Sequence, residues 1–252
     1  MRIELNKKRV TRNRRLATIT FLLTLGVLVA GFIVINLPLF TGELPSNFFV
    51  LLQLILVPLA FLLTVTSVRL TNNWARQPYP DEAINEGLKG ISKKSVVYHF
   101  YHAPAEHVLI APQGVFAIVT RWHKGYHTNQ GSDWRTKRSA LGRVANIIRM
   151  DGIGNPTQDA QRAASHVEKL LNKIVPDAEI DVTPLVVFLD PKAELELEDP
   201  EVEVLYASDK SEPSLTAYMR ELNRQQKENM QEKARLPLSD EQIAAFEAQT
   251  LR

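Results

Sequence analysis

Two long apolar stretches near the start of the chain dominate its hydropathy pattern. No charged side chain occurs from Leu16 to Gly42, and the apolar run within this segment covers residues 16–37. A second run of similar length covers residues 47–68. A bilayer crossing needs roughly 20 apolar residues, and inside hydrocarbon only a helix satisfies its own backbone polar groups. The pattern therefore predicts two transmembrane helices in the lipid bilayer, over 16–37 and 47–68, and a tight reversal of the chain between them.

Lys and Arg side chains near the two runs predict their orientation. Seven of them precede the first run, the linker between the runs has only Glu43, and Arg69 and Arg76 follow the second run. Because Lys and Arg accumulate on the cytoplasmic side, both termini are expected in the cytoplasm of a plasma (inner) membrane protein. A secretory signal peptide is the competing interpretation, but its apolar core normally has about 7–15 residues.

A polar, proline-rich segment, 69–80, separates the second run from the rest of the chain and predicts a linker. Beyond it, apolar residues recur at helical spacing over 81–91, where Asp81 is expected to cap the first turn. Another helix is expected to begin after Asn155 as its N-cap, with Pro156 at the first helical position.

Runs rich in β-branched and aromatic residues predict strands in the same region. They cover residues 96–102, 107–111, 115–122, 182–189 and 202–207. Between the second and third runs, Pro112 and Gly114 favour a tight turn, because proline presets its φ and glycine tolerates a positive one. Together with the helices, these strands predict one small α/β (α+β) domain with a mixed sheet over residues 81–208.

The two ends of the chain are polar. Residues 1–15 form a basic N-terminus, and residues 209–252 are expected to form a polar helical tail, because 221–235 is polar nearly all round. Up to Arg69 there are 8 Lys and Arg against 2 Asp and Glu, which leaves 22 against 26 for the rest. The chain has no cysteine, which excludes disulfides, zinc fingers, iron–sulfur clusters and a cysteine nucleophile.

Charge is also unevenly distributed after the linker. Residues 89–149 contain 10 Lys and Arg against 2 acidic residues, whereas residues 150–252 contain 11 against 21. Basic residues interleaved with Trp and Tyr, as in the first segment, are typical of nucleic-acid surfaces. The alternative is a solvated basic face balanced by the acidic strands and tail.

Five histidines between His99 and His127 raise the question of a zinc site. His99 and His102 are expected on opposite faces of a strand, and scattered strand histidines are usually surface residues. The His-Glu-x-x-His, P-loop and Gly-x-Ser-x-Gly patterns are absent from the sequence. No histidine metal site is therefore expected.

The segment AEHVLIAPQGVFAIVTR, residues 105–121, followed by Lys124 and Gly125, resembles the core of the nuclease-related domain, the NERD family. The resemblance covers about residues 81–208, and its further matches are Glu82, Leu88, Trp134, the Asn155-Pro156 pair and residues 186–188. It implies a fold like that of the PD-(D/E)xK nucleases, in which acidic residues hold Mg²⁺ or Mn²⁺ and a lysine helps to position the attacking water.

The positions that carry this chemistry in the family are altered here. Glu82 matches the family's helix glutamate, and Glu106 stands where the family usually has aspartate. Val119 stands at the glutamate of the E-x-K motif and Arg121 at its lysine. Valine offers no oxygen to a hard cation, and arginine, with a pKa above about 12, cannot share a proton with water. In the helix that follows, Asp159 occupies the slot of the family's glutamine.

The resemblance thus favours the fold and argues against the chemistry. We expect no catalytic residue and no cofactor, with Glu82 and Glu106 as the only candidate metal ligands. The leading hypothesis is a membrane-anchored NERD-like domain that binds nucleic acid or a protein at the cytoplasmic face without catalysis. Basic side chains near the degenerate motif are the candidate phosphate ligands: Arg121, Lys124, Arg135, Lys137 and Arg138.

Other interpretations remain open at this level. An active nuclease would use Mg²⁺ or Mn²⁺ with a displaced carboxylate such as Asp133 or Glu86. A structural membrane protein would dock a basic partner through its acidic half, especially residues 194–203. In a purely structural interpretation of the altered motif, Val119 fills core space and Arg121 pairs with Glu106 or Glu82.

Overall fold

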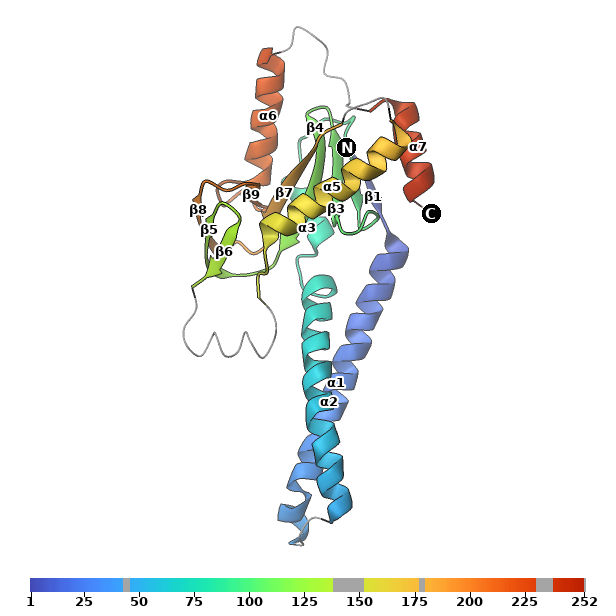
Figure 1. The fold of residues 1–252 in the computed structure, drawn as a ribbon, viewed down its shortest axis with the longest axis vertical. Helices are drawn as coiled ribbons and strands as arrows, with labels where there is room; N and C mark the ends of the chain where they lie inside the picture. Colours follow the sequence, from blue (N-terminus) through green and yellow to red (C-terminus); the bar gives the residue numbers. More distant parts are fainter. Residues whose placement is uncertain (43–45, 138–151, 177–179, 230–237, 252) are drawn as a thin grey trace. The chain divides into compact units, whose positions relative to one another are not determined.

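The computed structural model describes residues 1–42, 46–137, 152–176, 180–229 and 238–251 (Figure 1). The chain forms two compact units. One contains the two long apolar helices, and the other combines Met1–Lys7 with Pro78–Arg138 and Ile153–Arg252. We describe each unit by itself and call the second one the α/β domain.

The first unit contains α1 (Lys7–Thr41) and α2 (Asn47–Trp74). Both are long and apolar enough to cross a membrane, as the sequence predicted, and each continues beyond its expected span. Two side-chain hydrogen bonds connect them: Thr24 Oγ1 donates to the Leu63 carbonyl at 3.2 Å, and Gln53 Nε2 donates to the Val34 carbonyl at 3.3 Å. Most of their large apolar side chains are exposed, which suits a lipid environment.

The α/β domain is built on a 6-stranded mixed sheet. In spatial order its strands are β1 (Arg2–Leu5), β2 (Val96–His99), β3 (His107–Ala111), β4 (Gly114–Arg121), β7 (Val182–Phe188) and β9 (Glu203–Tyr206). The β2–β3 and β3–β4 pairs are antiparallel, and the other pairs are parallel. This confirms the mixed α/β class.

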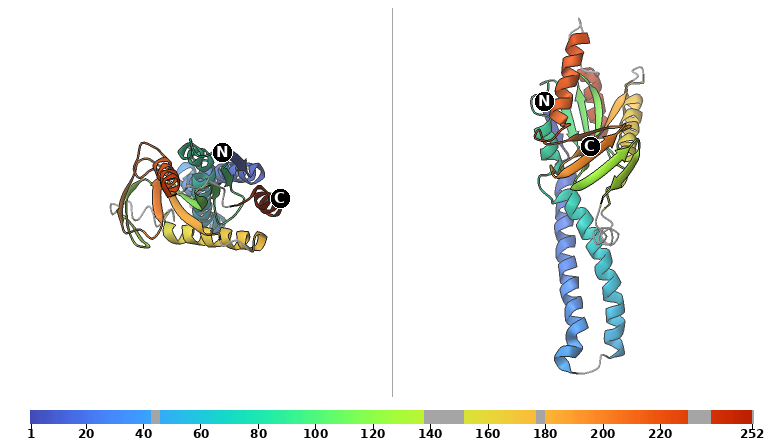
Figure 2. Two further views of the ribbon diagram at one scale, coloured as in Figure 1. Left: turned by 90° about the horizontal axis from the view of Figure 1, so that it is seen from above. Right: turned by 90° about the vertical axis from the view of Figure 1, so that its left-hand side faces the viewer.

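Helices cover both faces of this sheet (Figure 2). On one face, α5 (Pro156–Ile174) and α7 (Asp240–Thr250) pack against a core that includes Val108, Ala117 and Val186. On the other face, α3 (Pro80–Gly87) and α6 (Leu215–Asn229) pack against Val97, Ile118 and Leu185. Alternate residues of each strand therefore serve two cores.

A second, 3-stranded sheet has the order β6-β5-β8. Its strands are β5 (Gly125–Gln130), β6 (Asp133–Thr136) and β8 (Ala193–Glu198). The sequence analysis predicted none of them. They are short and rich in polar side chains, so they lack the apolar runs on which the other strands were predicted.

Of the predictions for the starts of two helices and for one hairpin turn, two are confirmed and one is wrong. Asn155 is the N-cap of α5, since its side chain accepts the Gln158 N–H at 3.0 Å, and Pro156 follows it as expected. Gly114 has a φ of +140°, which confirms the hairpin turn. The capping role of Asp81 is wrong: α3 begins at Pro80, whose missing N–H suits the first helical position, so Asp81 lies inside the first turn.

Both polar ends of the chain belong to the α/β domain. Arg2–Leu5 forms the edge strand β1, which pairs in parallel with β2. In the expected polar tail, α7 buries Ile243 and Phe246 in the core. Glu247 of α7 binds both Arg2 and the Tyr98 hydroxyl, the latter at 2.6 Å, so the two ends of the chain meet at β2.

Candidate functional site

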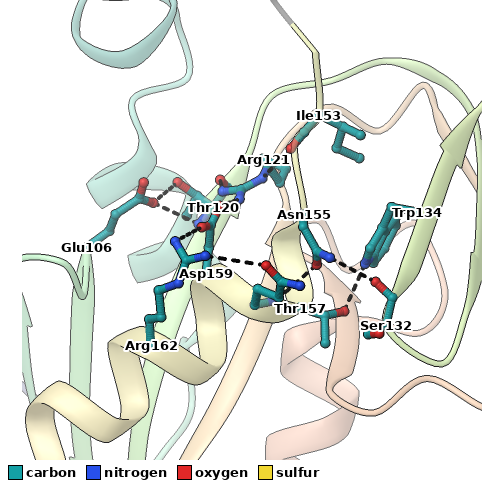
Figure 3. A network of polar contacts seen from close by, with 11 residues as sticks. Glu106, Thr120, Arg121, Ser132, Trp134, Ile153, Asn155, Thr157, Asp159 and Arg162 are labelled. Atoms are coloured by element: carbon teal, nitrogen blue, oxygen red, sulfur yellow. Dashed lines mark hydrogen bonds and ion pairs between the residues drawn. The ribbon is translucent and has the colours of Figure 1, made fainter.

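Glu106 lies at the end of a tight loop that leads into β3. The Phe100 N–H donates to the Glu106 carbonyl at 2.7 Å and closes this loop. The Glu106 carboxylate, which is half-buried, then reaches across to β4. There it accepts the Thr120 N–H at 2.7 Å and the Thr120 hydroxyl. The hairpin predicted from the sequence therefore holds this carboxylate in one position (Figure 3).

Desolvation controls the charge of Glu106. Burial raises the pKa of its carboxyl above the ordinary value, and the nearby charge of Asp159 adds to the increase. The hydrogen bonds from Thr120 and the positive charge of Arg121 oppose it. Burial is the largest of these effects.

Arg121, at the end of β4, is fully engaged by the protein. Its side chain is only 11% exposed and forms an ion pair with Asp159. Its Nε donates to the Ile153 carbonyl at 3.2 Å and its Nη1 to the Thr120 carbonyl at 2.9 Å. Because all three guanidinium nitrogens have partners, Arg121 is a fixed internal cation (Figure 3).

Asp159 belongs to the first turn of α5, where the helix dipole favours a negative charge. A second cation approaches it from the same helix, since Arg162 Nη1 lies 3.6 Å from its carboxylate and Arg162 is 68% exposed. The sequence analysis assigned Asp159 to the position of the family's glutamine but did not predict its ion pair with Arg121. It expected Arg121 to pair with Glu106 or Glu82 instead.

Val119 is 3% exposed and belongs to the core on the α5 face of the sheet. It therefore fills space between β4 and α5, as the structural interpretation expected. Glu82 is exposed on α3, whose buried residues pack against the opposite face of the sheet. Within the described residues, no group of three or more His, Asp or Glu side chains could hold a metal ion. The residues at the altered motif thus do not fit the metal that the NERD resemblance implies.

A second polar network connects the small sheet to the start of α5. Trp134 Nε1 donates to the Thr157 hydroxyl at 2.8 Å, and Asn155 Nδ2 donates to the Ser132 carbonyl at 3.1 Å. This network lies next to the Arg121 contacts in Figure 3.

Three of the other candidate phosphate ligands lie on or next to the small sheet. Lys124 is exposed just before β5, whereas Arg135 and Lys137 belong to β6 and the residue after it. Lys137 Nζ lies 5.5 Å from the ring centroid of Tyr126, a residue of β5. Arg138 lies outside the described residues. The sequence analysis grouped these cations because they are close together along the chain. In the fold the described ones are distributed over the end of β4, the residue before β5, β6 and the residue after it.

The acidic strand β8 belongs to the same small sheet as Arg135, with β5 between them. The register aligns Arg135 with Thr128 and Thr128 with Glu196, and the Tyr126 hydroxyl donates to Glu196. Glu194, Glu196 and Glu198 are all exposed. The basic segment of the sequence therefore lies beside carboxylates, which reduces the attraction of this sheet for a polyanion.

The expectation that the strand histidines are surface residues is wrong. His99, His102, His107 and His127 are each at most 2% exposed. His99 Nδ1 lies 2.7 Å from His107 Nδ1, and His99 Nε2 lies 3.0 Å from the Asn85 side-chain oxygen. Because that oxygen only accepts, His99 carries its proton on Nε2 and its Nδ1 accepts from His107. Burial lowers the pKa of His99 to about 4 and holds the pKa of His107 well below its ordinary value.

Comparisons with known proteins give no family assignment. No family model matches the chain, and neither a curated protein nor a solved structure matches it.

Proposed function

We propose that this chain is a membrane-anchored nucleic-acid-binding module whose α/β domain is related to the NERD family and to the PD-(D/E)xK nuclease fold. In this proposal the domain faces the cytoplasm and binds its ligand without hydrolysing it. The single observation that carries the absence of hydrolysis in this proposal is the Arg121–Asp159 ion pair beside Glu106, with Val119 buried at the expected metal position.

The ion pair argues against metal-assisted hydrolysis. A metal ion would need carboxylate oxygens directed at one point, but Asp159 is already neutralised by Arg121. Arginine does not share its protons with water as lysine can, so Arg121 does not replace the lysine of the E-x-K motif in activating water. In this proposal the Arg121 guanidinium takes the place that a metal ion has in a nuclease of this type.

The pairing of β1 with β2 supports the proposed membrane topology. Residues 2–5 precede α1, and residues 96–99 follow α2, yet both belong to one sheet. The chain must therefore cross the bilayer an even number of times between them. Two spans satisfy this condition, and the basic residues before the first span favour a cytoplasmic domain.

The test uses the full chain in nanodiscs of zwitterionic lipid, with a labelled single-stranded oligonucleotide and Mn²⁺. We expect the oligonucleotide to be bound, in a salt-dependent way, and to remain intact. Cleavage that Glu106→Ala abolishes would instead establish the nuclease alternative. Absence of binding would refute the proposal.

The nuclease alternative needs a displaced carboxylate. Asp133 is exposed on β6, and Glu86 forms an exposed ion pair with Lys89 at 2.6 Å. Asp159 is the carboxylate whose charge acts on Glu106, but Arg121 holds it. Of the displaced carboxylates, Asp159 is therefore the one that a surviving metal site would have to use.

A protein-docking function has one specific observation in its favour, namely the exposed glutamates of β8. A basic partner would compete there with Tyr126, whose hydroxyl binds Glu196. Loss of a captured partner in a Glu194→Gln, Glu198→Gln variant would support this function over nucleic-acid binding.

A further inference from the structure

An open groove of about 450 Å³ lies on the α/β domain between α5 and the loop before β3. Pro104 lines it from the loop, and α5 supplies Gln, Ser, His, Arg and Lys side chains. This volume is within the range of about 300–1,000 Å³ that is common for ligand sites. The sequence analysis did not single out any of its cationic residues.

Three ionisable side chains lie along one face of α5. Arg162, His166 and Lys169 are spaced by four and three residues, which places them in one row on the helix surface. At a rise of 1.5 Å per residue, Arg162 and Lys169 are separated by about 10 Å along the helix axis. The row is thus longer than one phosphate group.

The groove has a one-sided charge. No Asp or Glu is among its lining residues. Arg162 is 68% exposed; its Nη1 lies 3.6 Å from Asp159, and its Nη2 donates to the Gln158 side-chain oxygen at 3.3 Å. Both contacts are exposed, so the guanidinium can turn toward a ligand at little cost. Lys169 is exposed. The carboxylates of Asp159 and Glu201 contact the lining residues Arg162 and Gln161 from outside the groove. An anion in the groove would therefore compete with these two exposed contacts for its donors.

The loop that contributes Pro104 to the groove also carries a buried imidazole, two residues before that proline. His102 is 2% exposed, and its Nε2 is buried without a hydrogen-bond partner in the described part of the chain. Burial and, to a smaller extent, the charge of nearby His166 lower the pKa of His102 to about 4.

We propose that this groove binds the phosphodiester backbone of single-stranded nucleic acid, with Arg162 and Lys169 as phosphate ligands and His166 between them. The inference rests on the proposed function and assigns it a site. A row of donors about 10 Å long suits a linear polyanion better than one lipid headgroup. Pro104 and the His166 ring add flat surfaces against which a base can stack.

The experiment compares three forms of the full chain in zwitterionic nanodiscs: wild type, Arg162→Gln/Lys169→Gln, and Arg220→Gln/Lys227→Gln. The third is a matched control, because Arg220 and Lys227 are exposed, are seven residues apart and lie on α6, against the opposite face of the sheet. Each form is titrated with a labelled single-stranded oligonucleotide over a series of salt concentrations.

We expect the α5 variant to bind at least about tenfold more weakly and its plot of log affinity against log salt to become shallower by about 1.4. Each phosphate contact on a single strand contributes about 0.7 to that slope. The α6 variant should bind like wild type. In wild type, the imidazole NMR signals of His166 should shift on binding while those of buried His99 stay in place.

Equal binding by wild type and both variants would overturn the groove while leaving the proposed function intact. Absence of binding even by wild type would refute the proposed function, and the groove proposal with it. If the α5 variant lost binding to anionic phosphatidylglycerol vesicles while oligonucleotide binding was unchanged, the groove would be a lipid site and our inference would be wrong.

Discussion

Arg121 and Arg162 contact the same carboxylate of Asp159 in different environments. Arg121 is 11% exposed and also donates to two backbone carbonyls, whereas Arg162 is 68% exposed. An exposed ion pair is worth about 0–1 kcal/mol, but removing one member of a shielded network leaves the remaining polar groups without partners. The two arginines should therefore contribute very differently to stability.

We expect Arg121→Met to lower the free energy of unfolding by about 2 kcal/mol, because Asp159 and the Ile153 and Thr120 carbonyls lose their donor. Arg162→Met is the matched control and should cost less than about 1 kcal/mol. Denaturant unfolding of the full chain in micelles measures both. Equal costs would show that the Arg121 network does not hold β4 to α5.

The buried histidines predict a loss of stability in acid. The pKa values of His99 and His102 are lowered to about 4, so between about pH 6.5 and 4 the unfolded chain binds protons that the folded chain rejects. Each group should then cost about 1.4 kcal/mol per pH unit as the pH falls through this window. Glu106 acts in the opposite sense, since its raised pKa favours the folded state on protonation.

The measurement is the unfolding midpoint between pH 7 and pH 4, together with the imidazole NMR signals of His99 and His102. The midpoint should decrease steadily with acidification while both rings stay neutral to well below pH 6. Titration of these rings near pH 6.5 with a flat stability profile would contradict the assigned burial.

At the residue scale the sequence predicted the hairpin that carries Glu106, Val119 and Arg121 but not the contacts of these residues. Glu106, Val119 and Arg121 could be placed because they follow one hairpin, whose pairing is local. The Arg121–Asp159 pair joins residues 38 positions apart, and its formation depends on how α5 lies on the sheet. The groove was missed for the same reason, because Pro104 and α5 are brought together only by the fold.

At the scale of the elements, the strand β1 was not predicted, because its segment is short and half polar. Its residues Arg-Ile-Glu-Leu resemble many exposed segments, and they form a strand because β2 offers them an open edge. Likewise, α7 has few apolar residues, but Ile243 and Phe246 are three apart and enter the core together. By contrast, α5 was predicted well, because its cap and its apolar spacing are both local signals.

A pair of proline variants tests β1. The Arg2 N–H donates to the Ser95 carbonyl at 2.8 Å and the Asn6 N–H to the His99 carbonyl at 3.1 Å. Since strand N–H groups alternate in direction, the Glu4 N–H also faces β2, whereas that of Ile3 faces away. We expect Glu4→Pro to lower the unfolding midpoint and Ile3→Pro to leave it nearly unchanged.

Circular dichroism of the full chain against denaturant measures both variants. Exposure of the β2 edge should also make Glu4→Pro more prone to aggregate, because an open edge strand is a template for intermolecular pairing. If the two prolines had the same effect, the pairing of β1 with β2 would not contribute to stability.

At the scale of the whole molecule, the six-stranded sheet is formed by segments from before and after the two apolar helices. Strand β1 precedes α1, whereas the other strands of the sheet follow α2. A truncated chain beginning at Asn72 would lack an edge strand, so binding experiments belong with the full chain.

The absence of cysteine allows a direct test of this topology. In inside-out membrane vesicles, a membrane-impermeant maleimide should label Thr11→Cys and Lys210→Cys but not Ser46→Cys, which lies between the two spans. Right-side-out vesicles should give the reverse pattern. Labelling of Thr11→Cys and Lys210→Cys from opposite sides would contradict the two-span arrangement.

The central claim is that a fixed guanidinium has replaced metal chemistry in this domain. Isothermal titration of Mn²⁺ into the full chain in zwitterionic nanodiscs, beside Glu106→Ala, tests it most directly. We predict no stoichiometric binding by either protein, because Arg121 holds Asp159 and Val119 supplies no ligand. Stoichiometric binding by the wild-type chain that is lost in Glu106→Ala would contradict the account.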